Sequence, residues 1–163
     1  MATVDAKITP FFWYATEAEE AAKLYVSLFP NSSINSVNTM PADSPSGPAG
    51  AVKVVEFTLS GQTFTAMSAG GQEPFNHSIS MVVNCKDQKE VDHYWDGFLA
   101  AGGKAEACGW LRDRFGVAWQ ITPIQLIEMM KDKDRVRGKR VAEAMMKMIK
   151  LDIAGLQKAY DGK

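Results

Sequence analysis

Apolar and polar positions in the first part of the chain predict a strand, a helix and three further strands. The segment "KITPFFWY" is apolar and aromatic and predicts a buried strand. In the following "ATEAEEAAKLYVSLFP", apolar side chains recur at helical spacing, and Thr16 is the expected N-cap of a helix. The segments "SSINSVNTM", "AVKVVEFTLS" and "QTFTAMSAG" predict three strands, the last two joined by a tight turn at Ser60–Gly61.

The same order of elements then begins again. "HSISMVVNC" predicts a strand, "KDQKEVDHYWDGFLAAGG" a helix, and "KAEACGWL" and "GVAWQITP" strands around the turn "RDRFG". Side chains of similar size and polarity recur at an offset of 70 residues in the helices and 55 in the last strands, as in Tyr25 and Trp95, Phe64 and Trp119, Thr65 and Gln120. The pattern predicts two βαβββ modules, at residues 7–70 and 75–123.

Residues 124–163 form a helical tail. Val141, Met145, Met148 and Ile149 fall on one predicted apolar stripe. So much apolar helix on a small domain is expected either to wrap a neighbouring subunit or to seal an open face of its own unit. We expect the former, as a homodimer that uses the C-terminal helices, and we interpret residues 1–163 as a single domain.

Composition excludes several classes of protein. The net charge is −1, although Lys131 to Lys163 holds ten Lys or Arg against five Asp or Glu. These cations are interrupted by Met and Ala at helical spacing, which predicts the solvated face of a helix and no nucleic-acid partner. No apolar run approaches the roughly 18 residues that span a bilayer, and "MATVDAKITP" lacks the apolar segment of a secretion signal. Two cysteines, Cys85 and Cys108, are too few for a disulfide framework. We expect a cytoplasmic protein without a membrane partner.

Two tandem βαβββ modules, the second containing "CGWLRDRFGVAWQITP", resemble the vicinal-oxygen-chelate superfamily of glyoxalase and bleomycin-resistance proteins. The closer resemblance is to its PhnB-like branch, through "FFWYATEAEEAAKLYVSLFP", "VDHYWDGFLAAGG" and the tail "AMMKMIKLDIAGLQKAY", and it covers essentially the whole chain. It implies an α+β fold in which the two modules form one cupped, eight-stranded mixed sheet. Proteins of this branch are often labelled demethylubiquinone 3-methyltransferases. The chain lacks a glycine-rich strand-to-helix loop followed by an acid, so we expect no nucleotide-like cofactor.

The resemblance also implies a place for a metal ion. Relatives in the superfamily hold a divalent ion with His, Glu or Gln from the first and last strands of each module. Counted back from each helix, those positions fall on Pro10 and Ser80, and the last strands supply Thr65 and Gln120. Only Gln120 carries a suitable donor. We therefore expect no metal and no cofactor. If a metal binds, its ligands are His77, Glu56 and Gln120, which needs a strand register that turns His77 toward the cup.

The remaining candidates in the signature stretch have structural explanations. Cys108 could be a nucleophile, but no histidine lies in its segment to act as base. Asp113 and Gly116 are expected to shape the turn. Arg112 and Arg114 flank it with opposite orientation, so one at most would face a pocket, where it would favour an anion.

Large aromatic side chains with few polar neighbours are typical of a pocket for a small molecule. We predict a pocket lined by Trp13, Thr65, Ser80, Trp110 and Gln120. The first functional hypothesis is a metal-free protein that binds a small molecule in this cup. The alternative is a metal-dependent enzyme of the same superfamily acting on a small oxygenated substrate, and a methyltransferase is the least supported. No catalytic residue is assigned.

Overall fold

A computed structural model describes residues 7–71 and 73–163. The chain divides into two compact units, Met1–Pro74 and Phe75–Lys163. Within the described residues the two units contain two four-stranded mixed sheets and five helices, so the fold is α+β as predicted.

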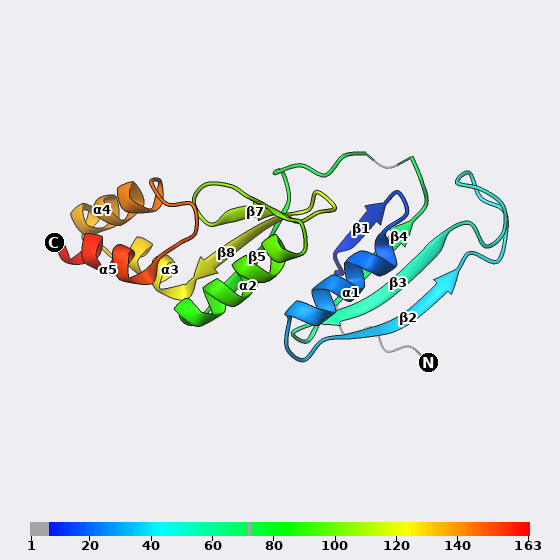
Figure 1. The fold of residues 1–163 in the computed structure, drawn as a ribbon, viewed down its shortest axis with the longest axis horizontal. Helices are drawn as coiled ribbons and strands as arrows, with labels where there is room; N and C mark the ends of the chain where they lie inside the picture. Colours follow the sequence, from blue (N-terminus) through cyan, green and yellow to red (C-terminus); the bar gives the residue numbers. More distant parts are fainter. Residues whose placement is uncertain (1–6, 72) are drawn as a thin grey trace. The chain divides into compact units, whose positions relative to one another are not determined.

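The first unit is a βαβββ module. Its elements are β1 (Phe11–Tyr14), α1 (Ala18–Leu28), β2 (Ser33–Thr39), β3 (Lys53–Leu59) and β4 (Gln62–Ser68). The strand order is β1-β4-β3-β2, with β1 parallel to β4 and the other pairs antiparallel (Figure 1). Helix α1 covers one face of this sheet, where Tyr25 packs near Phe57 and the rings of Phe57 and Phe64 stack at 5.5 Å. These aromatic side chains are buried and form the core of the unit.

The second unit repeats this module and adds the tail. Its elements are β5 (Ser80–Cys85), α2 (Gln88–Ala100), β6 (Lys104–Ala105), β7 (Trp110–Arg112), β8 (Ala118–Pro123), α3 (Ile124–Met130), α4 (Arg135–Met145) and α5 (Ile153–Asp161). The strand order β5-β8-β7-β6 has the same connectivity as the first sheet, again with one parallel pair. Phe98 of α2 lies 4.7 Å from the Trp119 ring, so α2 covers one face of this sheet.

The predicted single strand "KAEACGWL" is two strands, β6 and β7. Cys108 and Gly109 between them have φ values of 60° and 80°, which turn the chain back on itself. Their N–H groups donate to the carbonyls of Met148 and Ile149 in the tail, both at 2.8 Å. The tail thus accepts the hydrogen bonds that Cys108 and Gly109 would have made to a neighbouring strand. The division of this segment into β6 and β7 provides the fourth strand of the second module.

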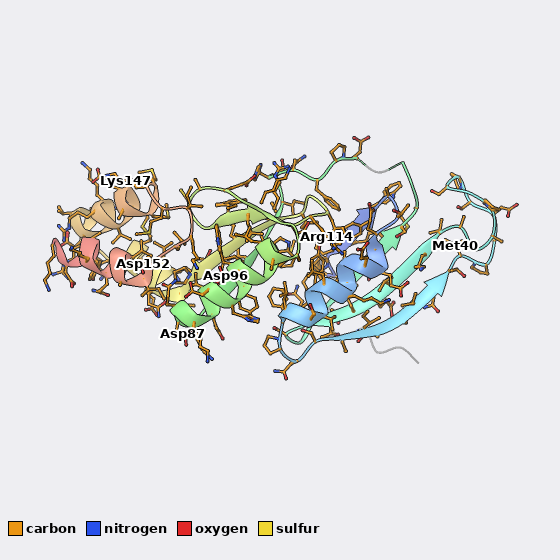
Figure 2. The ribbon with its side chains drawn as sticks, viewed as in Figure 1. Met40, Asp87, Asp96, Arg114, Lys147 and Asp152 are labelled. Atoms are coloured by element: carbon orange, nitrogen blue, oxygen red, sulfur yellow. The ribbon has the colours of Figure 1, made fainter. Side chains whose placement is uncertain are left out.

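The helix starts differ from one another in their capping. Thr16 is not the N-cap of α1, because the first helical N–H, that of Ala18, donates instead to the hydroxyl of Ser68 at 3.0 Å. Helices α2, α4 and α5 carry their own caps, and Figure 2 shows Asp87 at the start of α2 and Asp152 at the start of α5. A cap from a distant strand cannot be recognised by local spacing.

The tail forms a small core within the second unit. Its buried members are Leu126, Met129, Val141, Leu151 and Leu156. Ile149 does not join them and is 55% exposed, because α4 ends at Met145 and the helical spacing stops there. These residues pack against one another within the second unit, and the predicted role of the tail in a dimer stays a prediction. Among the helices in the described ranges, none has the length and apolar composition needed to cross a membrane.

Candidate functional site

Three of the five predicted pocket residues lie on one face of the second sheet. Strand pairing places Trp110 beside Gln120, and Ser80 and Arg112 on either side of Ala118. Paired residues point to the same face of a sheet, and alternate residues of a strand share a face. Ser80, Trp110, Arg112 and Gln120 therefore share the face opposite α2, which we call the polar face of the second unit.

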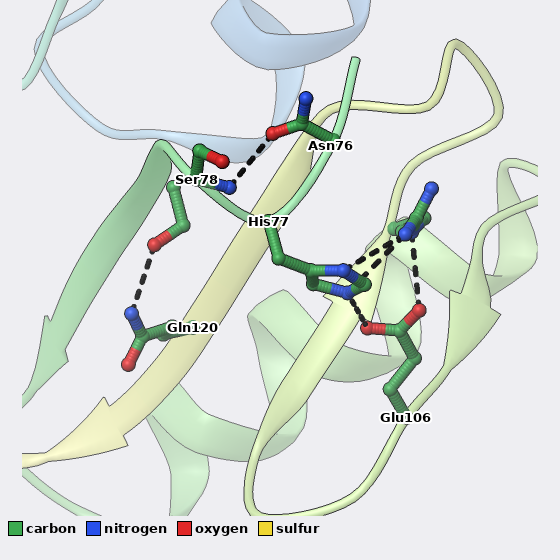
Figure 3. Close-up of polar contacts among 7 residues, drawn as sticks. Asn76, His77, Ser78, Glu106 and Gln120 are labelled. Carbon is green, nitrogen blue, oxygen red and sulfur yellow. Dashed lines mark hydrogen bonds and ion pairs between the residues drawn. The ribbon is translucent and has the colours of Figure 1, made fainter. Parts of the chain in front are cut away.

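Ser80 and Gln120 form a hydrogen-bonded pair on the polar face. The amide Nε2 of Gln120 donates to the hydroxyl of Ser80 at 2.8 Å (Figure 3). This bond determines which groups the pair offers to a ligand. The hydroxyl proton of Ser80 and the Oε1 atom of Gln120 have no hydrogen-bond partner within residues 7–71 and 73–163. The pair can donate one hydrogen bond and accept another.

A cluster of three charged or titratable side chains lies beside this pair. Glu106 accepts from Arg112 Nε at 3.1 Å, and its other oxygen lies 2.6 Å from His77 Nε2. The Nη2 atom of Arg112 lies 2.9 Å from His77 Nδ1 and 3.4 Å from Nε2. A guanidinium can only donate, so Nδ1 accepts and Nε2 carries the proton that is donated to Glu106. Both ring nitrogens of His77 are thus engaged by charged side chains.

His77 is not positioned by strand alternation. Its distance of three residues from Ser80 predicted that it faces away from the pocket, but β5 begins only at Ser80, and His77 lies in a turn. The Asn76 side chain accepts from the Ser78 N–H at 2.8 Å across this turn (Figure 3). The His77 ring then meets the edge of Trp110 at 5.6 Å, so it lies beside residues of the polar face.

Nothing in the sequence pattern pointed to Glu106 as a site residue. It follows β6, and Arg112 ends β7, so the two side chains meet only if "KAEACGWL" folds into a hairpin. The six-residue spacing of Glu106 and Arg112 becomes a signal once a turn at Cys108–Gly109 is recognised.

The other predicted residues lie on the corresponding face of the first unit. Phe11 pairs with Thr65, and Glu56 pairs with Thr65 from the opposite side, so Trp13, Glu56 and Thr65 share the face opposite α1. Trp13 Nε1 donates to the Gly70 carbonyl at 3.0 Å, and Glu56 accepts from Ser36 at 3.1 Å.

The strand registers change the assignment of Pro10. Phe11 pairs with Thr65 as Val82 pairs with Gln120, so the first strands repeat at 71 residues and not at the 70 of the helices. The equivalent of Ser80 is therefore Thr9 and not Pro10. A threonine hydroxyl is also a poor ligand, so the correction does not improve the donor set.

Two of the three predicted metal ligands, His77 and Glu56, already have protein partners. Both nitrogens of His77 and one carboxylate oxygen of Glu56 are hydrogen-bonded. Within the described ranges, no group of three or more His, Cys, Asp or Glu side chains is arranged to hold a metal ion. Imidazole binds a metal through a nitrogen lone pair, and in His77 that lone pair accepts from Arg112. In this arrangement both ring nitrogens of His77 are engaged by protein side chains.

Asp113 and Gly116 shape the turn, as predicted. Asp113 is 3% exposed, and its carboxylate accepts from the N–H groups of Phe115 and Val117 and from Trp119 Nε1, at 2.9 to 3.0 Å. Gly116 has a φ of 95°, which favours glycine. Arg114 stacks on the ring of Phe115 at 4.8 Å, so Arg112 is the one arginine of the stretch on the polar face.

Two surface hollows lie away from the polar face, among α2 and the tail helices. They measure about 360 and 450 Å³ and share Gln125 and Gln157. The Oε1 atom of Gln125 is buried without a partner in the described part of the chain. Neither hollow includes a predicted pocket residue.

Comparison with known proteins agrees with this architecture. The fold is that of the vicinal-oxygen-chelate superfamily. A family model described as 3-demethylubiquinone-9 3-methyltransferase matches residues 6–122, and the chain belongs to this PhnB-like family. The tail lies beyond the matched residues.

Solved structures of similar proteins share this fold. A putative 3-demethylubiquinone-9 3-methyltransferase, PhnB protein, from Bacillus cereus is 30% identical, with a TM-score of 0.61 over 72% of this chain and 99% of that one. Protein PA1353 from Pseudomonas aeruginosa is 20% identical, with a TM-score of 0.54 over 72% of this chain and 97% of that one. The fosfomycin resistance protein FosX from Listeria monocytogenes is 17% identical, with a TM-score of 0.52 over 80% of this chain and 100% of that one. The last two share only the fold. No match was found among curated proteins.

Proposed function

We propose that this PhnB-like protein binds a small organic molecule on the polar face of its second unit, without a metal ion. The observation that carries the proposal is the Ser80–Gln120 pair beside Trp110. A flat aromatic surface with a few polar groups at fixed positions is typical of small-molecule sites. Trp13 and Thr65 lie on the corresponding face of the first unit, which is a separate candidate surface for a ligand.

A metal-dependent enzyme using His77, Glu56 and Gln120 is the second candidate. It requires His77 to give up its bond to Arg112, and so to leave the arrangement that also holds Glu106. A methyltransferase, which the family description names, has the least support because the chain offers no glycine-rich loop for a nucleotide-like cofactor.

A protein-observed NMR screen of small organic compounds tests the first candidate. We expect hits to shift the backbone and side-chain resonances of Ser80, Trp110 and Gln120, and Gln120→Ala to weaken binding about tenfold, the loss of one good hydrogen bond. Gln125→Ala, in a hollow away from this face, is the matched control. Hits that shift only residues elsewhere would refute this location.

Metal analysis separates the second candidate from the first. Protein purified without chelator is expected to hold no stoichiometric divalent ion, with His77→Ala unchanged. One bound ion per chain, lost in His77→Ala, would overturn the metal-free proposal. Calorimetry with S-adenosylmethionine tests the methyltransferase, and we expect no binding.

The tail supports a proposed homodimer. Val136 and Met146 of the tail are 65% and 61% exposed, which leaves apolar surface that the core of the second unit does not use. Light scattering after chromatography is expected to show a dimer, and a Val136→Asp/Met146→Asp variant a monomer. A wild-type monomer would refute this role.

A further inference from the structure

We propose that Arg112 is the anchor of the ligand, and that the ligand carries an oxyanion, a carboxylate or a phosphate. This inference rests on the proposed binding site on the polar face and names the chemical class of its ligand. Three features of Arg112 support it: unused hydrogen-bond donors, fixed placement, and a local excess of positive charge.

The guanidinium of Arg112 has more N–H donors than its protein partners use. An arginine carries five N–H donors, and here one on Nε is given to Glu106 and one on Nη2 to His77. Within the described ranges, Nη1 has no hydrogen-bond partner. Its two N–H groups and the second N–H of Nη2 remain available. The edge formed by Nη1 and Nη2 has the geometry that pairs with two oxygens of a carboxylate or phosphate.

The guanidinium is also held in place before a ligand arrives. The side chain of Arg112 is 33% exposed, and its partner Glu106 is 30% exposed. Glu106 holds Nε while His77, itself bonded to Glu106 and in edge contact with Trp110, holds Nη2. A free surface arginine loses rotamer freedom when it binds an anion, whereas Arg112 has lost much of that freedom on folding.

The charges around Arg112 favour an anion. Strands β5 to β8 contain no Asp or Glu, and Lys104 of β6 pairs with Arg112 in register. Lys104 and Arg112 carry two positive charges and Glu106 one negative charge, so these three side chains sum to +1. Glu106 divides its two oxygens between Arg112 and His77, so it does not occupy both edges of the guanidinium.

The strand spacing sets the size of the ligand. Arg112 and Ser80 lie on either side of Ala118 across three neighbouring strands, which places them about 10 Å apart at two strand spacings. Trp110 and Gln120 form the adjacent row. A small organic acid can therefore place its oxyanion at Arg112, its apolar part on Trp110 and a polar group at the Ser80–Gln120 pair.

Matched probes test this inference by NMR. Benzoate and phenyl phosphate supply the two oxyanions on the same ring, and benzamide is the neutral counterpart of benzoate. The readouts are the Arg112 Nε–H and Trp110 Nε1–H resonances of the full chain at millimolar probe. We expect both anions to shift these resonances and benzamide to bind at least tenfold more weakly; the tighter of the two anions identifies the oxyanion.

Variants isolate the contribution of Arg112. Arg112→Gln is expected to weaken oxyanion binding about 10- to 100-fold and to leave benzamide unchanged. Arg112→Lys keeps the charge and the ion pair with Glu106 but loses the fork, so it should recover part of the affinity even if the glutamine variant folds poorly. Arg114→Gln, in the neighbouring turn, is the matched control and should bind like wild type.

Failure of the oxyanion inference can be distinguished from failure of the proposed binding site. Equal binding of benzoate and benzamide, with Arg112→Gln unchanged, would overturn the oxyanion inference and leave the proposed site standing. If no probe shifts Ser80, Trp110 or Gln120, the proposed site fails as well.

Discussion

Replacing Asp113 by alanine tests whether the signature stretch has a structural role. Its carboxylate is the shared acceptor for three N–H groups in the turn between β7 and β8. The Phe115 N–H can be solvated when the carboxylate is removed, because Phe115 is partly exposed. The Val117 residue and the Trp119 indole are 4% and 2% exposed, so their donors lose their partner without gaining water.

The expected loss of stability follows from these two buried donors. An unsatisfied buried donor costs about 1–3 kcal/mol, so Asp113→Ala should lower the free energy of unfolding by about 2–6 kcal/mol. That is a large fraction of the 5–15 kcal/mol that is typical of a folded domain. Asp134 is the matched control, since it accepts from two N–H groups at the exposed start of α4. Asp134→Ala should lower the free energy by about 1 kcal/mol.

Urea unfolding followed by tryptophan fluorescence measures both losses, and hydrogen exchange of the Trp119 indole N–H gives a local readout. We expect this proton to be protected in wild type and in Asp134→Ala but to exchange rapidly in Asp113→Ala. A loss of stability in Asp113→Ala no larger than that in Asp134→Ala would contradict the structural role of the Asp113 carboxylate. Asp113→Asn keeps one acceptor oxygen and should fall between wild type and the alanine variant.

Three further predictions concern thiol reactivity, acid stability and the tail. Burial raises the pKa of the Cys85 thiol to about 12. Iodoacetamide at about pH 8 should therefore label Cys108 in the native protein and react with Cys85 only after unfolding. Equal labelling rates of the two cysteines in the native protein, measured by mass spectrometry, would contradict this. The pKa of Glu19 is lowered from the ordinary 4.5 to about 2, chiefly by its hydrogen bond to the Lys23 ammonium. The stabilisation of the folded state by the Glu19 carboxylate is therefore present above about pH 4.5 and is lost as the pH falls toward 2. Urea unfolding at about pH 5 and pH 3 should therefore show a smaller acid-induced loss for Glu19→Gln than for wild type, and equal losses would count against the ion pairs. Leu156 is fully buried, so Leu156→Ala should cost about 2–5 kcal/mol in thermal or urea unfolding, whereas Ile149→Ala should stay within about 0.5 kcal/mol; similar costs would disprove the assignment of the tail core.

The candidate site was predicted from sequence only in part. Ser80, Trp110 and Gln120 were recognised because each lies on a predicted strand, where alternation defines the face. His77 was placed on the wrong side because alternation was carried beyond the start of β5 into a turn. Glu106 was not predicted because its contact with Arg112 depends on the β6–β7 hairpin. The turn of that hairpin is Cys108–Gly109, which is not one of the common hairpin dipeptides such as Asn-Gly or Asp-Gly.

The family was recognised from the resemblance of "CGWLRDRFGVAWQITP" and the other signature segments, whereas the sequence pattern by itself determined the two βαβββ modules and the helical tail. These follow from apolar periodicity and from a repeat that extends over many residues, so a local error does not change them. Only the tertiary structure decided how β6 and β7 divide, which side chain caps α1, and which atoms of Arg112 remain available. Each of these depends on a hydrogen bond between residues that are distant in sequence or separated by a turn, and such bonds leave no period in the chain.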